Sequence, residues 1–201
     1  LETEISDAVA EKMIAQLSSQ NPRLRMQAGL TLGRLGLGRV GLAATPVPLG
    51  AFCHDAAADL KMPWLRHGLV MGLAGTQRPE DLLKLAQGQD AAQATFATLA
   101  LARQRSPLLA QLLASPHQDV VNEAVRAIHD DEGIPTAQAA LAQSLGRSAL
   151  PATALRRVIN QNLRDGSPAA ATRILQWLQA QPESAPLVDE ALQALLVFEL
   201  P

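Results

Sequence analysis

Apolar residues recur every three or four positions along nearly the whole of this 201-residue chain. Stripes with this spacing lie within residues 5–17, 24–35, 49–60, 121–128, 155–163 and 188–195. No stretch alternates apolar and polar residues at a sustained period of two. An apolar face that repeats at about 3.6 residues is typical of amphipathic helices, so the pattern predicts helices throughout and no β-sheet.

Proline interrupts these stripes at short intervals. Steps such as Asn21-Pro22, Met62-Pro63 and Ser167-Pro168 fit the first turn of a helix and disfavour helix at the residue before it. They cut the chain into about a dozen short helices, which pair off over residues 5–36, 47–75, 79–104, 107–130, 135–165 and 168–199. Each pair covers roughly 30 residues, the length of a helical repeat unit. We predict an all-α fold of about six helix pairs, stacked as a right-handed α-α superhelix in a single domain over residues 1–201.

Three glycines of the first pair recur in the second. The offset is 39 residues for all three, from Gly29, Gly33 and Gly36 to Gly68, Gly72 and Gly75. Because glycine has no Cβ, a helix face lined with it lets a neighbouring helix approach closely. We therefore predict close contact between these helices, with chance recurrence in a chain rich in glycine and alanine as the alternative.

The second helices of several pairs share a short phrase, an acidic or amide residue followed by an aliphatic–Arg pair and an alanine. It reads Asn21-Pro-Arg-Leu-Arg25-Met-Gln-Ala28, then Trp64-Leu-Arg66, then Asp119-Val-Val-Asn-Glu-Ala124. The phrase resembles the HEAT-repeat pattern, in which Asp and Arg form a ladder between stacked repeats. The resemblance implies a HEAT- or armadillo-like solenoid with Arg25 and Arg66 at inter-repeat contacts, although Asn122 departs from the pattern. Tetratricopeptide repeats are the alternative, but their Trp-Leu-Gly-Tyr pattern is absent.

Residues 105–166 carry a more specific resemblance. Its segments are Val121-Asn-Glu-Ala-Val-Arg-Ala-Ile-His-Asp130, Ile134-Pro135 and Leu155-Arg-Arg-Val-Ile-Asn-Gln-Asn162-Leu-Arg164. Together they look like the HEAT-like segment of the large heme-binding, membrane-bound-dehydrogenase-type proteins of planctomycetes and verrucomicrobia. In that family a sugar-dehydrogenase-like propeller precedes the helices and a c-type cytochrome domain follows them. The resemblance implies a periplasmic or secreted setting.

The two ends of the chain, Leu-Glu-Thr-Glu and Glu199-Leu200-Pro201, lead us to expect a piece excised from a longer multidomain protein. The heme of the family is not expected in this piece. Cys53 is the only cysteine, and the heme motif Cys-x-x-Cys-His needs two.

Charge and composition argue against several kinds of function. The formal net charge is −2, and aromatic residues make up 2% of the chain, with no tyrosine. Nucleic-acid binding relies on a basic field and on aromatic stacking, so we expect no nucleic-acid partner. No apolar run approaches the roughly 20 residues of a membrane span. We predict a non-catalytic scaffold or interaction module that binds protein and holds no cofactor. The alternative is a helical-repeat enzyme of the DNA glycosylase or bilin lyase kind.

Two motifs suggest chemistry but lack its structural context. Gly36-Leu-Gly-Arg-Val-Gly41 matches a dinucleotide phosphate turn, which needs a strand before it and a helix after it. Here a predicted helix precedes it, which favours a glycine-rich helix end. Cys53 lies on an apolar stripe and is predicted to be a core residue. Its neighbour His54 points about 100° away around the helix, so no nucleophile–base pair is expected.

The densest polar cluster is His129-Asp130-Asp131-Glu132, at the end of a predicted helix. Acids at a helix C-terminus oppose the helix dipole and need compensation. We predict that Asp130 or Asp131 pairs with an arginine, either Arg126 of the same helix or one of the following pair, with a cation site as the alternative. Asn162 lies on an apolar stripe and should make a structural hydrogen bond to a neighbouring loop. The predicted inter-repeat polar residues are Arg25, Arg66, Asp130, Asp131, Arg157, Asn162 and Arg164, with Arg156 as a further candidate partner.

Overall fold

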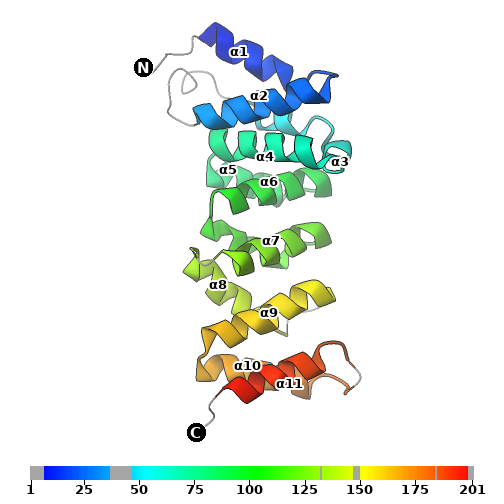
Figure 1. Ribbon diagram of the computed structural model, residues 1–201, viewed down its shortest axis with the longest axis vertical. Coiled ribbons are helices and arrows are strands. Elements are labelled where there is room, and N and C mark those ends of the chain that lie inside the picture. Colours follow the sequence, from blue (N-terminus) through cyan, green and yellow to red (C-terminus); the bar gives the residue numbers. More distant parts are fainter. Residues whose placement is uncertain (1–6, 37–46, 132, 147–149, 184, 199–201) are drawn as a thin grey trace. The chain divides into compact units, whose positions relative to one another are not determined.

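The computed structural model describes residues 7–36, 47–131, 133–146, 150–183 and 185–198. Within these ranges the secondary structure consists of eleven α-helices and two 3-10 helices, without a strand (Figure 1). The prediction of an all-α chain is confirmed. The helices fall into two compact units, Leu1–Ser106 and Pro107–Pro201, and each unit is described by itself.

Unit 1 is built from short helices whose starts follow the proline pattern. Proline occupies the first turn of α2, α4 and α5, while Asn21 and Asp90 cap α2 and α6 through their side chains. Helix α2 packs on α4, and α4 packs on α6. The elements are α1 (Asp7–Gln16), α2 (Pro22–Leu35), η1 (Leu49–Cys53), α3 (Ala56–Asp59), α4 (Pro63–Thr76), α5 (Pro79–Ala86) and α6 (Ala91–Arg103).

Glycine sets the contact between α2 and α4. A Cβ added at Gly29 would lie 2.5 Å from the carbonyl oxygen of Gly68, and one added at Gly75 would meet the backbone of Gly33. Real Cβ atoms do not approach other atoms this closely, so the two backbones can meet only because Gly29 and Gly75 lack side chains. The close approach predicted from the repeated glycines is confirmed.

Two segments differ from the expected α-helices. The stripe of residues 49–60 divides into the 3-10 helix η1 and the short α3, and residues 107–114 form the 3-10 helix η2. Each segment begins at or just after a proline that removes a backbone donor. In η2 the buried Leu109 and Leu112 are three residues apart, which matches the three-residue turn of a 3-10 helix.

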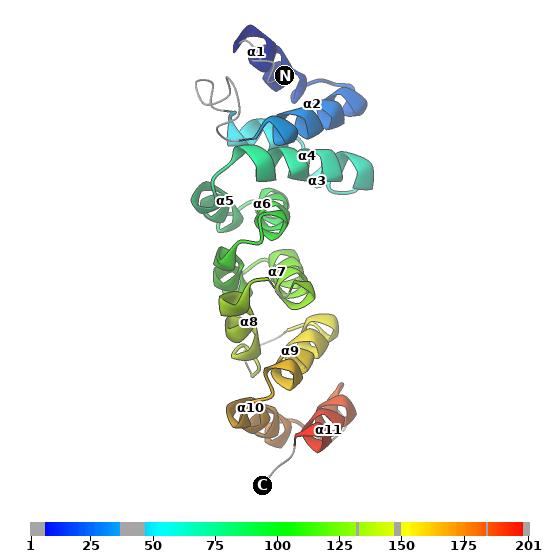
Figure 2. The same ribbon diagram turned by 60° about the vertical axis from the view of Figure 1, so that its left-hand side comes forward.

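Unit 2 continues the alternation of stacked and flanking helices. Helix α7 packs on α9 and α9 on α11, while η2, α8 and α10 pack beside them (Figure 2). Its core includes a cluster of Ile159, Ile174, Trp177, Ala191 and Ala194. The elements are η2 (Pro107–Ala114), α7 (Gln118–Asp130), α8 (Pro135–Ala142), α9 (Ala152–Asp165), α10 (Pro168–Gln179) and α11 (Val188–Val197).

Candidate functional site

A buried ion pair joins the first two predicted helix pairs. Arg25 of α2 donates to Asp59 at the end of α3 over 2.5 Å, and the Asp59 side chain is 1% exposed. Burial raises the pKa of the Asp59 carboxyl above its usual value, although the positive charge of Arg25 acts in the opposite direction. Arg25 was predicted to make an inter-repeat contact, whereas its partner Asp59 was not. The missed signal was an acid three residues after Ala56, on the apolar stripe itself.

The hydrogen bond that Arg66 makes to the described residues lies within its own helix pair, whereas an inter-repeat contact was expected. Its guanidinium donates to the carbonyl oxygen of Leu60 over 3.3 Å, only six residues earlier. That carbonyl follows the end of α3, where helix carbonyls have no partner within the helix. Arg66 therefore satisfies the end of α3 within its own helix pair.

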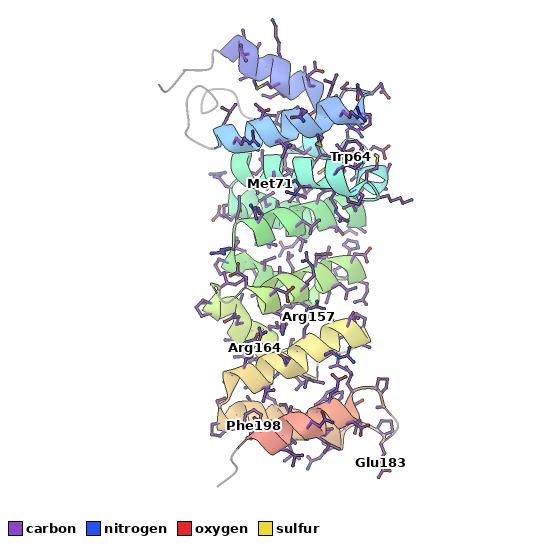
Figure 3. All side chains as sticks on the ribbon, in the orientation of Figure 1. Trp64, Met71, Arg157, Arg164, Glu183 and Phe198 are labelled. Atoms are coloured by element: carbon purple, nitrogen blue, oxygen red, sulfur yellow. The ribbon has the colours of Figure 1, made fainter. Side chains whose placement is uncertain are left out.

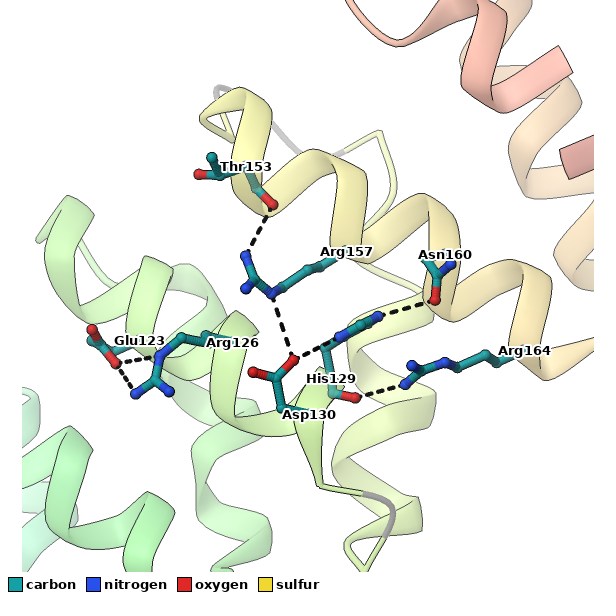
Figure 4. A network of polar contacts seen from close by, with 8 residues as sticks. All are labelled: Glu123, Arg126, His129, Asp130, Thr153, Arg157, Asn160 and Arg164. Atoms are coloured by element: carbon teal, nitrogen blue, oxygen red, sulfur yellow. Dashed lines mark hydrogen bonds and ion pairs between the residues drawn. The ribbon is translucent and has the colours of Figure 1, made fainter. Parts of the chain in front are cut away.

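The C-terminal end of α7 meets a row of polar side chains on α9 (Figure 4). The Nε atom of Arg157 lies 3.7 Å from Oδ1 of Asp130, and Arg164 donates to the carbonyl oxygen of His129 over 2.7 Å. The His129 ring bridges the two helices, with Nδ1 2.9 Å from Asp130 and Nε2 3.0 Å from Oδ1 of Asn160. The positive groups of α9 thus compensate the negative end of the α7 dipole.

The structure brings Asp130 to Arg157 of the following pair. Desolvation acts to raise the pKa of Asp130, but the hydrogen bond from His129 and the charge of Arg157 outweigh it and hold the pKa below its usual value. Asp131 accepts a hydrogen bond from the backbone N–H of Gly133 over 2.8 Å, in the turn after α7. Arg126 pairs with Glu123 of its own helix.

The alternative of a cation site at this cluster finds no support in the described part of the chain. Glu132, the fourth member of the cluster, lies outside the described residues. Among the residues that are described, no three His, Cys, Asp or Glu side chains are grouped closely enough to hold a metal ion.

Asn162 connects three helices from a fully buried position. Its Nδ2 atom donates to the carbonyl oxygens of Ala142 and Val158, each over 2.9 Å, and its Oδ1 atom accepts from Nε of Arg173 over 2.7 Å. The partner Ala142 is the last residue of α8 rather than part of a loop. Arg173 of α10 also pairs with Asp165 near the surface, so the polar network around Asn162 extends further than the sequence indicated.

A second ion pair links α9 to α11. Both Nε and Nη2 of Arg156 bond Glu190, with Nε to Oε2 at 2.8 Å and Nε to Oε1 at 3.0 Å. The pair is exposed to solvent. The guanidinium lowers the pKa of Glu190 through its hydrogen bonds. Neither residue follows a pattern that would predict the contact, because both stand on polar faces of their helices.

The remaining chemical motifs have structural roles where they are described. Gly36 ends α2 with φ of 68° and donates its N–H to Leu32, while residues 37–46 lie outside the described part. Cys53 is buried, and burial together with the nearby carboxylates of Asp90 and Asp59 raises the pKa of its thiol to about 12. His54 is exposed. No helix among the described residues has the length and apolar character to cross a membrane.

Two depressions line the face of α9 that carries these polar groups. The first has a volume of about 410 Å³ and is lined by Arg156, Arg157, Arg164, Asn160, Thr153 and the end of α7. The second, of about 330 Å³, lies between α9 and α11 and has Ile159, Leu163, Ala194 and Val197 in its wall. Arg156 and Asn160 border both depressions, so the two are adjacent.

Comparison with known proteins adds little to this geometry. No protein-family model matches the chain. No curated protein matches it either. The crystal structure of an engineered protein aligns with a TM-score of 0.44 and 17% sequence identity, over 93% of this chain and 94% of that one. A likeness of that size says nothing about what this chain binds.

Proposed function

We propose that this chain is a non-catalytic helical-repeat scaffold of the HEAT-like solenoid type, which binds protein partners through its stacked alternate helices. The supporting observation is a spacing that recurs in three of its inter-helix polar contacts. Arg25 and Asp59 are 34 residues apart, as are Arg156 and Glu190, and the carbonyl of His129 meets Arg164 over 35 residues. A spacing close to one helix pair, present in both units, is expected when each repeat contacts the next one along the chain.

The alternate helices give this scaffold a surface for partners. In unit 2, α7, α9 and α11 present polar side chains and two adjacent depressions, and Arg157 and Arg164 lie along this face (Figure 3). Stacked repeats characteristically use such a continuous face for binding. Exposed arginines suit it, because a guanidinium offers several donors in a fixed geometry.

On the resemblance of residues 105–166, we further propose that the chain spaces a dehydrogenase-like propeller and a cytochrome c domain within a longer periplasmic or secreted protein. The sequence that flanks the chain in its gene tests this directly. A strand-rich repeat region before it and a Cys-x-x-Cys-His motif after it would support the arrangement. Flanking sequence without either would remove it.

Site-specific photo-crosslinking in the native host tests the scaffold function. A photoreactive residue at Asn160 on α9 should give a small number of discrete protein adducts, while one at Thr172 on α10 serves as the matched exposed control. Equal, diffuse adducts from both positions would contradict a dedicated binding face. The competing enzyme class is tested by incubating the purified chain with alkylated duplex DNA, and release of free base would refute a non-catalytic role.

A further inference from the structure

The cationic depression beside α7 has unused hydrogen-bonding capacity. Arg157, Asn160 and Arg164 are spaced i, i+3 and i+7 along α9, which places them on one face of the helix. Each guanidinium carries five N–H donors. Arg164 uses one on the carbonyl of His129, and Arg157 makes a 3.4 Å contact with the carbonyl of Thr153 and a 3.7 Å approach to Asp130. Toward the described residues, most of their donors therefore remain for a ligand or solvent.

The neighbouring depression has an apolar wall whose deeper part is core and whose rim is open to solvent. Ile159, Leu163 and Ala194 line its wall, and Val197 at the end of α11 is 67% exposed. Val197 therefore leaves aliphatic surface open at the edge of this depression. Since Arg156 and Asn160 border both depressions, one short peptide segment can occupy both depressions at once.

The chemistry of the cationic depression favours a single carboxylate. Asp130 shares the depression with the arginines, and Glu190 already occupies the guanidinium of Arg156. Two guanidinium groups beside one carboxylate leave a small positive excess, which suits a monoanion better than a doubly charged phosphate. The net charge of −2 over the whole chain disfavours a long polyanion such as nucleic acid. A guanidinium fork also matches the geometry of a carboxylate.

We propose that this face of α9 binds a peptide segment of a partner protein in which an Asp or Glu side chain lies next to an aliphatic side chain. The carboxylate accepts hydrogen bonds from Arg157 and Arg164, and the aliphatic side chain packs against the partly buried Leu163 and the exposed Val197. The proposal rests on the proposed function, because it takes a protein partner as given and specifies what that partner presents.

Selection from a displayed library of random peptides, with the 201-residue chain immobilised, tests the proposal. We expect enriched sequences to contain an acidic residue beside Leu, Ile or Val. In fluorescence anisotropy, replacing that acid by its amide should weaken binding at least tenfold, and affinity should fall as salt is raised. Inorganic phosphate should compete poorly. If inorganic phosphate competes with the peptide as well as a free carboxylate does at the same concentration, the site is a general anion site and the proposal is overturned.

Variants locate the binding on α9 without removing the arginines that support α7. Asn160→Asp keeps an oxygen acceptor for His129 but adds a negative charge between the two arginines, and should weaken binding at least tenfold. Val197→Ser should weaken it severalfold. The matched controls are Arg126→Gln on α7 and Leu196→Ser, which is 86% exposed on α11 and lies outside the groove lining. Both controls should bind as the unmodified chain does.

The outcomes separate this site from the proposed function. If selected peptides bind equally well to Asn160→Asp and Val197→Ser, the α9 site is refuted while a protein-binding scaffold stands. If no peptide is enriched and crosslinking in the host gives no discrete adduct, both proposals fail.

Discussion

Replacing Gly29 by alanine tests whether backbone contact sets the packing of α2 on α4. The new Cβ would lie 2.5 Å from the carbonyl oxygen, 2.9 Å from the carbonyl carbon of Gly68 and 3.2 Å from the nitrogen of Leu69. All three atoms belong to the α4 backbone, so no flexible side chain can move aside. The two helices must separate, and even a gap of about 0.5–1 Å forfeits a quarter to a half of the dispersion attraction at each contact.

Two opposing effects decide the size of the change. Alanine in place of glycine in a helix interior stabilises by about 1 kcal/mol through helix propensity. Overpacking an interface typically costs about 1–3 kcal/mol, and contact with backbone atoms places this case at the upper end. We expect Gly29→Ala to lower the free energy of unfolding by about 2 kcal/mol, which corresponds to a fall of roughly 10 °C in Tm for a unit of this size.

Urea unfolding followed by far-ultraviolet circular dichroism measures the change, and hydrogen–deuterium exchange should localise it to α2 and α4. Gly50→Ala is the matched control, because a Cβ at Gly50 has no atom within 4 Å. We expect the control to change stability by less than about 0.5 kcal/mol. If Gly29→Ala is as stable as the unmodified chain or more so, the glycines are incidental and the proposed basis of this interface is wrong.

Three further predictions concern individual side chains. Arg25→Met should lower the free energy of unfolding by about 3–5 kcal/mol at pH 7, because it leaves Asp59 charged and buried. Urea titrations should show a smaller loss at pH 5, since the raised pKa of Asp59 lets acid neutralise its carboxylate. Cys53 should resist thiol reagents in the folded chain at pH 8 and react once urea unfolds it, because its thiol is buried with a pKa of about 12. A double-mutant cycle on Asp130→Asn and Arg157→Gln should give a coupling below about 1 kcal/mol, present at pH 7 and lost only as pH falls through the lowered pKa of Asp130.

The sequence anticipated features that depend on local spacing. The repeated glycines act within two helices whose boundaries proline marks, so their contact could be predicted without knowing the rest of the fold. The compensation of Asp130 by Arg157 was also accessible, because an acid at a helix end needs a positive partner and the next helix pair supplies it.

Contacts that depend on how a segment bends were missed. Reading residues 49–60 as one apolar stripe left Asp59 unexplained, although it stands seven residues after Phe52 and three after Ala56 on the buried face. The same rule that placed Asn162 in a hydrogen bond, that a polar residue on an apolar stripe needs a partner, would have identified it. Glu190 offered no such signal, since an exposed acid on a polar face has many possible partners.

Alternate helices contact each other differently in the two units, and the difference affects where a partner can bind. Between α2 and α4 the glycines bring backbone against backbone, leaving no room for even a Cβ at Gly29. Around α9, arginine side chains reach to α7 and α11 beside an apolar cluster that includes Ile159 and Ala191, and the two depressions are lined by these arginines. A contact made by side chains can rearrange at little cost, whereas one made by backbones cannot. The helices around α9 are therefore better suited to accept a ligand than α2 and α4. Among the described residues, guanidinium donors without a protein partner and the exposed aliphatic side chain of Val197 occur together there.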